Sequence, residues 1–471
     1  MLLRLCTVAL VAVAHGAVSI SAHPLKVETE CGMILGFINT STPDVRQFLG
    51  VPFVLPPTGC RRWLPPAANY NPAAAVNATN FGLSCPQIPL SASTPPNVFT
   101  SDGGGQTEFF PRQNFSEDCL TLNIWAPAHP HATALPVIRT QAHIVVSVNF
   151  RSNIFGFPNA AGLGEQNLGL LDQRAGLEWV RANIGAFGGD PARIVAWGQS
   201  AGAIAADYLH FAFHDDPIVQ GSILDSGTAL FPQSTRLSND TAQRNFAQVA
   251  AQLGCGGVAA AQIDCLRDAS WESIEGLLAA NASLSFLPVA DSRVVFANYT
   301  AQYAAGAVAR VPVIIGTNQH ELNALDELVP GGNESHSDAV TNATFLCTAA
   351  ETTQLRQAVG LTTYRYRYDG NFTNISPPTF PGAYHGAELP LIFGTAGQYH
   401  GASTPYEDVV SMKLQDLWLA FAQDPQNGLL AAGWAPYGAG VAVLLGDTDT
   451  PVKQIDVHEL DDGVCVSAAL G

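Results

Sequence analysis

Ser200 lies between closely spaced glycines in the sequence Gly198-Gln-Ser-Ala-Gly202. An apolar run over 193–197 precedes it, and a segment typical of a helix follows it over 201–210. This order predicts a strand, a sharp turn and a helix, with the serine hydroxyl raised clear of a sheet at the turn. The N-terminus of the helix would point its unpaired N–H groups, beginning with Ala201, at the group that the serine attacks. The chemistry predicted is therefore nucleophilic attack by a serine.

A serine hydroxyl is a weak nucleophile at neutral pH, so this chemistry needs two further side chains. An imidazole must take the proton from the serine oxygen, and a carboxylate must hold that imidazole in the right tautomer. A G-x-S-x-G sequence occurs by chance in many long chains, since glycine is a common residue. The prediction therefore depends on the sequence around Ser200 and on these two partners.

Three stretches of the chain resemble the type-B carboxylesterase family, which includes cholinesterases and secreted fungal esterases and lipases. They are NLGLLDQRAGLEWVRANIGAFGGDPARIVAWGQSAGA over 167–203, EDCLTLNIW over 117–125 and IVVSVNFR over 144–151. The resemblance runs with gaps from about Val27 into the C-terminal region. It implies an α/β-hydrolase fold, with a mostly parallel central sheet and helices on both faces, here shortened by internal gaps.

In this family the nucleophile is followed along the chain by an acidic residue and then by a histidine. The resemblance places the acidic residue at Glu321, in a loop after the apolar strand pattern over 311–316. The chain departs from the family here, because Leu322 replaces the usual glycine and His320 takes a position often held by aspartate. His320 is also a rival for the base, but it would lie beside the acid rather than across from it.

The base that the resemblance implies is His385, in the sequence GAYHGAELP over 382–390. A histidine among the twelve of this chain is usually structural or solvated, so its flanking glycines and the family match support the assignment. Glu388 is expected at a helix start or behind the catalytic residues, rather than as the triad acid. Ser226 matches a family serine near the triad, and a supporting hydrogen bond is expected from it.

One feature of the family is missing from this chain. In the family, a strand ending in H-G-G-G supplies most of the N–H donors that bind the oxyanion, but here 135–143 passes almost at once into the next strand. The N–H of Ala201 is the one family donor that remains. A second shortfall falls between Glu321 and Cys347. An oxyanion site with fewer donors predicts impaired activity.

These observations leave three interpretations. The first is a secreted serine carboxylic ester hydrolase that forms an acyl-enzyme with a small-molecule or lipid ester. The second is a weak or inactive glycoprotein that keeps the hydrolase fold for binding, although such proteins typically lose the serine. The third is an ordinary esterase whose sequence here lacks a segment, which the transcript across Thr140 would reveal. A cholinesterase is not expected, since the loop between Cys85 and Cys119 has no tryptophan for cation–π contact with choline.

The first 22 residues are predicted to be a signal peptide, because Arg4 precedes an apolar run over 5–13 that ends among small residues. Residues 23–471 are predicted to form a single α/β-hydrolase domain, since no linker-like stretch divides them. Ten N-x-[ST] sequons and the eight cysteines that follow the signal peptide fit a secreted, extracellular glycoprotein. Its disulfides should form in an oxidising compartment.

The resemblance implies two disulfides, Cys85–Cys119 and Cys255–Cys265. Spacing leaves the pairing of the other four cysteines open, and one arrangement is Cys31–Cys60 with Cys347–Cys465. No C-x-x-C or clustered Cys/His spacing appears, so neither a metal site nor another cofactor is expected.

Composition restricts the partners of the chain. Its formal charge of −18 and isoelectric point of about 4.9 argue against nucleic acid and anionic membrane surfaces. Beyond the N-terminal run, no apolar stretch reaches the ~18 residues that a transmembrane helix needs. With 47% hydrophobic and only 13% charged residues, the chain should bury a large core.

Overall fold

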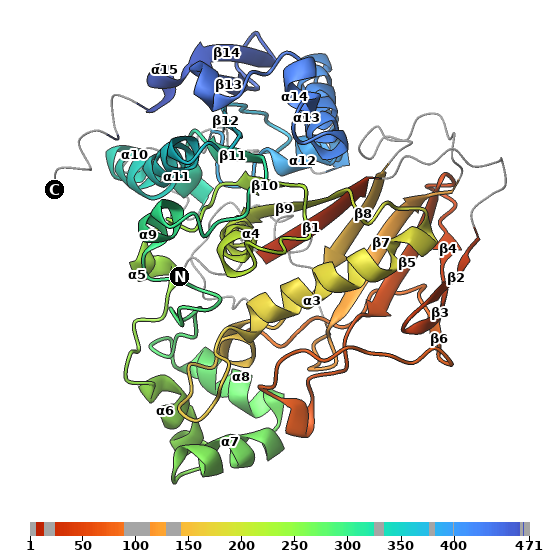
Figure 1. The fold of residues 1–471 in the computed structure, drawn as a ribbon, viewed down its shortest axis with the longest axis vertical. Coiled ribbons are helices and arrows are strands. Elements are labelled where there is room, and N and C mark those ends of the chain that lie inside the picture. Colours follow the sequence, from red (N-terminus) through yellow and green to blue (C-terminus); the bar gives the residue numbers. More distant parts are fainter. Residues whose placement is uncertain are drawn as a thin grey trace.

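The computed structural model describes residues 6–13, 24–88, 114–128, 143–324, 334–375, 382–398, 400–461 and 465. A large sheet crosses the molecule, and helices pack against it (Figure 1). Its strand order is β14-β13-β12-β11-β10-β9-β1-β8-β7-β5-β4, and a second sheet has the order β2-β3-β6.

The strands of the large sheet are β1 (Cys6–Val13), β4 (Phe37–Ile38), β5 (Val45–Pro52), β7 (Thr121–Pro127), β8 (His143–Val148), β9 (Ile194–Ser200), β10 (Gly221–Asp225), β11 (Val313–Asn318), β12 (Thr363–Tyr368), β13 (Val441–Leu445) and β14 (Val452–Asp456). The small sheet contains β2 (Lys26–Thr29), β3 (Gly32–Leu35) and β6 (Ala75–Asn77).

The longer helices are α3 (Leu168–Asn183), α4 (Ala201–Ala212), α6 (Arg244–Gln252), α7 (Ala259–Asp268), α8 (Trp271–Ala280), α10 (Glu334–Thr341), α11 (Cys347–Ala358) and α13 (Pro405–Gln423). Shorter ones are α2 (Asn153–Gly156), α5 (Gln233–Arg236), α9 (Tyr299–Ala304), α12 (Leu389–Ile392), α14 (Gly428–Ala431) and α15 (Val457–Asp461).

Strand directions confirm the expected mostly parallel sheet. From β9 to β13, each strand pairs in parallel with the next strand of this series. The antiparallel pairings of β1, β8, β7 and β5 give β8 and β5 the same direction as β9. The carboxyl ends of these parallel strands therefore point the same way, which is where α/β enzymes place their reactive groups.

The two faces of the sheet bury different side chains, because successive residues of a strand point to opposite sides. Trp197, Ile223 and Ile314 pack with residues of α12 and α13 on one face. Leu224 and Ile315 pack with residues of α4 on the other face. Helices thus cover both faces of the sheet, as the α/β-hydrolase prediction requires (Figure 1).

Strand β1 takes the position between β8 and β9 and pairs with both in antiparallel fashion. Its register places the Cα of Cys6 opposite that of Ser200, the predicted nucleophile at the end of β9. These residues belong to the predicted signal peptide, while residues 1–5 and 14–22 lie outside the described part of the chain. The sheet is therefore continuous beside β9 only while the N-terminal segment is attached.

Three disulfides join Cys85 to Cys119, Cys255 to Cys265 and Cys347 to Cys465. The possible pairing of Cys31 with Cys60 is wrong, because both thiols are free. Cys31 is buried, where the indole N–H of Trp179 donates to its sulfur at 3.1 Å, whereas Cys60 is exposed. Cys31 thus lies inside the protein and Cys60 on its surface, although spacing in the sequence allows the two to pair.

No helix within the described ranges is long and apolar enough to cross a membrane.

Removal of residues 1–22 should destabilise the chain, because β8 and β9 would each lose a hydrogen-bonded neighbour. Each such bond contributes about 0.5–1.5 kcal/mol, so the loss of several should lower the free energy of unfolding by several kcal/mol. Urea unfolding of the refolded, disulfide-bonded chains 1–471 and 23–471 measures this difference. Equal midpoints with equal slopes would show that another segment closes the sheet.

Candidate active site

Ser200 lies at the sharp turn between β9 and α4, as its glycine spacing predicts. Its backbone has φ 59° and ψ −125°, a region that residues with a side chain rarely adopt. A Cβ on Gly198 would lie 2.3 Å from the carbonyl carbon of Gly202, and one on Gly227 would lie 2.6 Å from the Ser200 carbonyl oxygen. Only glycine fits these positions, which explains why the serine can turn so tightly.

His385 and Glu321 form a buried pair close to this turn. His385 Nδ1 lies 2.6 Å from a carboxylate oxygen of Glu321, and the two side chains are 1% and 0% exposed. The other carboxylate oxygen accepts the backbone N–H of Asn318 at 2.7 Å. Since a carboxylate accepts from an N–H, Nδ1 carries the proton and Nε2 of the neutral ring is left as an acceptor. This is the tautomer that a general base requires.

Asn318, at the end of β11, connects the Glu321 loop to the His385 loop. Its side-chain amide donates to the carbonyl of Tyr384 at 2.7 Å and to the carboxyl of Glu388. The His385 ring also packs on Phe345, with ring centroids 5.2 Å apart. These contacts fix the imidazole from two sides.

Two further carboxyl groups lie buried behind the pair. Burial raises the pKa of Asp225 to about 7, with a smaller contribution from the charge of Glu321, while Trp197 and Tyr366 donate hydrogen bonds to it. Burial also raises the pKa of Glu388 well above its usual range. A raised pKa favours the uncharged form, so this arrangement limits how many negative charges accumulate beside Glu321.

The Nε2 atom of His385 contacts Gln199 rather than Ser200. The side-chain nitrogen of Gln199 lies 3.1 Å from Nε2. Within the described part of the chain, no hydrogen bond joins the Ser200 hydroxyl to His385. Catalytic hydrogen bonds are often long in the absence of substrate and tighten when it binds, so this arrangement is compatible with a resting enzyme.

Ala201 is the first residue of α4, so its N–H has no acceptor within the helix and can point toward a charge formed at Ser200. The segments that could carry further family donors, including 129–142, lie outside the described residues.

The remaining residues singled out from the sequence have other environments. His320 is one-third exposed and pairs with Asp338 at 3.5 Å rather than with Glu321. Glu388 is the residue before α12, as expected, and it accepts a hydrogen bond from Asn318. The hydrogen bond expected from Ser226 is absent, because its hydroxyl has no partner among the described residues. Ser226 instead acts through its backbone. Its φ of 57° forms part of the turn that places Gly227 against Ser200.

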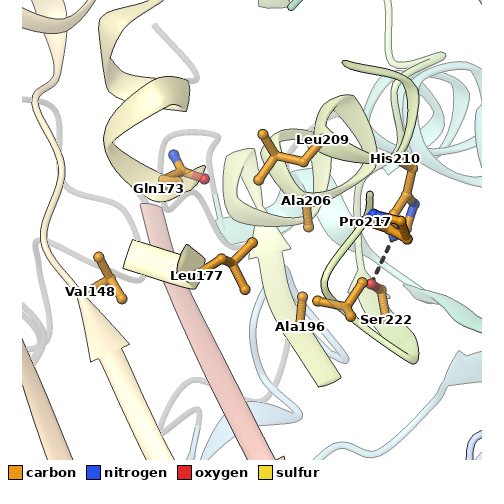
Figure 2. A pocket seen from close by; sticks show the side chains of 10 residues that line it. Val148, Gln173, Leu177, Ala196, Ala206, Leu209, His210, Pro217 and Ser222 are labelled. Atoms are coloured by element: carbon orange, nitrogen blue, oxygen red, sulfur yellow. Dashed lines mark hydrogen bonds between the residues drawn. The ribbon is translucent and has the colours of Figure 1, made fainter. Parts of the chain in front are cut away.

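A second serine and histidine, Ser222 and His210, line a pocket between α3, α4 and the sheet (Figure 2), and Asp207 contacts this histidine. His210 Nε2 lies 2.8 Å from the Ser222 hydroxyl, and its Nδ1 lies 3.2 Å from Asp207. Ser222 is 0% exposed and lies within β10, so its hydroxyl has neither access nor a helix N-terminus beside it. Asp207 also accepts the N–H of Ala229 at 2.7 Å. The hydrogen bonds of His210 and Asp207 therefore hold α4 against β10 and the loop that follows it.

Sequence reasoning missed three residues that contact His385 or Glu321, namely Gln199, Asn318 and Phe345. Gln199 directly precedes Ser200, and Asn318 ends the strand before Glu321, so both could have been singled out from their positions in the sequence. Phe345 gave none, because its contact with His385 arises from packing of a distant segment. No group of three or more potential metal ligands occurs among the described side chains.

The sequence matches the model of the carboxylesterase family over residues 23–140, 137–339 and 329–458. It is 41% identical to the chlorogenic acid esterase of Aspergillus niger over 481 aligned residues, which cover 93% of this chain and 92% of that protein. It is 36% identical to secreted lipase 5 of Gibberella zeae over 471 aligned residues, covering 87% of each. The acetylcholinesterase of Electrophorus electricus is 32% identical over 70% of this chain and 57% of its own length.

These matches extend over most of the chain and confirm the resemblance seen in its motifs. The parallel sheet and the strand, turn and helix around Ser200 agree with them. The chain belongs to the carboxylesterase family.

Proposed function

We propose that this protein is a secreted serine carboxylic ester hydrolase, with Ser200 as nucleophile, His385 as general base and Glu321 as the acid that orients the base. The observation that carries the proposal is the buried 2.6 Å contact between His385 and Glu321, next to a serine in a strained turn. Membership in the carboxylesterase family supports the reaction class.

In this mechanism Ser200 attacks the carbonyl carbon of the ester while His385 Nε2 takes the proton of the hydroxyl. Glu321 stabilises the imidazolium through Nδ1, and the Ala201 N–H donates to the oxyanion of the tetrahedral intermediate. Collapse of the intermediate breaks the bond to the alcohol, which leaves with the proton from His385. Water then attacks the acyl-enzyme by the same route, with His385 again acting as base, and releases the acid.

The substrate class that we propose is a small-molecule or lipid ester. Relatives of the chain include proteins named as a chlorogenic acid esterase and as secreted lipases. The chain carries a formal charge of −18, so it should repel nucleic acid and anionic surfaces. Esters presented on such partners are therefore poor substrates.

Secretion is proposed from the N-terminal apolar run, from the disulfides and from relatives whose names include the word secreted. The family match begins at residue 23, directly after the proposed signal peptide. Cleavage there would remove β1 from its position beside β9.

We further propose that the oxyanion site of this chain is incomplete. The family match is divided into separate ranges, two of which meet and overlap at 137–140, and the alignment with the A. niger esterase spans more positions than this chain has residues. Both observations support a missing segment, and the strand position filled by β1 is where such a segment could pair.

An alternative function is binding by a weak or inactive glycoprotein, which the incomplete oxyanion site would favour. The retained triad favours the enzyme.

Ser200→Ala should abolish labelling by a fluorophosphonate probe, because the probe reacts with an activated serine. Ser222→Ala is the matched control, since Ser222 has its own histidine and aspartate but no access. This variant should keep its label, while losing about 1–3 kcal/mol of stability through an unpaired buried histidine. Gel detection of the label and thermal unfolding measure the two effects. A label that survives in Ser200→Ala would contradict the assignment.

His385→Ala should lower kcat more than Glu321→Gln does. Removing a general base costs about 10²–10⁴-fold, whereas glutamine at 321 can still accept a hydrogen bond from Nδ1. Steady-state hydrolysis of p-nitrophenyl esters by both variants and the parent provides the comparison. Equal or reversed losses would count against the roles given to these residues.

Restoring an H-G-G-G-bearing segment after Val137 should raise the hydrolysis rate of p-nitrophenyl esters by at least about 10²-fold, the usual effect of a single oxyanion donor. When residues 1–22 are absent from both chains, the restored chain should also be more stable, because the new strand can pair with β8 and β9 in the position that β1 otherwise fills. Comparable rates in the two chains would mean that another group completes the oxyanion site.

A further inference from the structure

Gln199 occupies the position immediately before the nucleophile and lies against the catalytic base. Its side-chain nitrogen is 3.1 Å from His385 Nε2, although the two residues are 186 positions apart in sequence. The side chain is only 7% exposed, so bulk water does not replace this contact. A polar group buried against a catalytic atom affects which form of that atom is favoured.

The protonation of the His385 ring determines which atom donates and which accepts in the contact with Gln199. Nδ1 is committed to Glu321 as a donor, so Nε2 of the neutral ring accepts, and the Gln199 amide donates to it. The amide thus occupies the lone pair that must later receive the proton of Ser200. Substrate binding has to release that lone pair before Ser200 can attack.

The other groups around His385 differ from Gln199 in charge. Glu321 contacts Nδ1, and the buried carboxyls of Asp225 and Glu388 interact with Glu321. Phe345 contributes an apolar ring. From the neighbouring loop and α10, His320 and Asp338 pair with each other. Among the described residues, the group that contacts Nδ1 is therefore a carboxyl with further carboxyls behind it, whereas the partner at Nε2 is neutral.

This neutral partner has a consequence for the reaction. A carboxylate favours the positively charged form of a neighbouring imidazole, and a carboxylate at both nitrogens would favour it twice over. The imidazolium cannot take a proton from serine. An amide at position 199 avoids this second charge while still holding the ring.

We propose that Gln199 is a positioning residue that holds His385 Nε2 in its unprotonated form between turnovers, and so extends the reaction of Ser200 to lower pH than a carboxylate at this position would allow. The inference rests on the proposed function, since it assumes that His385 is the base for Ser200.

The test compares the rate of fluorophosphonate labelling as a function of pH in the parent, Gln199→Glu and Gln199→Met. The pH at which labelling is half-maximal on the acid side should rise from the parent to the methionine variant and again to the glutamate variant. The total shift in Gln199→Glu should be about one pH unit or more, as expected for an added opposite charge within hydrogen-bond distance. Gln252→Glu, on the exposed end of α6, adds the same charge far from the site and should leave the profile unchanged.

An unchanged or lowered half-maximal pH in Gln199→Glu would overturn the proposal. If that variant fails to fold, as judged by circular dichroism and thermal unfolding, Gln199→Met decides: its half-maximal pH must exceed that of the parent, and an equal or lower value overturns the inference. Failure of the proposed function gives a different result, because Ser200 would then not be labelled in the parent, or His385→Ala would be labelled as fast as the parent.

Discussion

The backbone of Ser200 is the constraint on which the site depends. A residue other than glycine in such a conformation costs about 1–3 kcal/mol and persists only where its surroundings hold it. Here β9 is fully buried and paired with a strand on each side, and α4 packs back onto the sheet. Gly198 and Gly227 allow backbone atoms to approach where any side chain would collide. The strain presents the hydroxyl at the carboxyl edge of the sheet and directs the start of α4 toward it.

That dependence makes the neighbour of β9 important. On one side, buried hydrogen bonds join α4 to β10 through His210 and to the loop after β10 through Asp207. On the other side lies β1, an apolar segment with the features of a signal peptide. The residues of β1 therefore have two incompatible roles, because a signal peptide is cleaved off whereas a central strand must remain in the sheet. If another segment supplied the strand between β8 and β9, the signal peptide could be removed and the sheet would stay continuous.

The sequence was sufficient for the parts of the structure that local patterns encode. The turn at Ser200 follows from glycine spacing between a buried strand and a helix, and the sheet follows from repeated apolar runs. The positions of Glu321 and His385 came from motifs, each attached to a loop at a strand end. Their contact was an implication of family resemblance, since 64 residues separate them.

Other features needed the folded chain. The thiols of Cys31 and Cys60 stay free because Cys31 is buried against Trp179 while Cys60 is exposed in a short 3-10 helix, which spacing does not encode. The missing hydrogen bond of Ser226 and the contact of Gln199 with His385 depend on side-chain directions across the site. The use of β1 as a central strand also could not be read from its sequence, because a short apolar run suits a strand and a leader equally.

The most direct test of the account is to trap the acyl-enzyme. Tryptic digestion should release residues 194–236 as one peptide, which contains both Ser200 and Ser222 because no lysine or arginine lies between Arg193 and Arg236. After acid quenching of a reaction with p-nitrophenyl butyrate, tandem mass spectrometry locates any added acyl group within this peptide. The account predicts a butyryl group on Ser200, whereas an acyl group on Ser222 or elsewhere during turnover would contradict it.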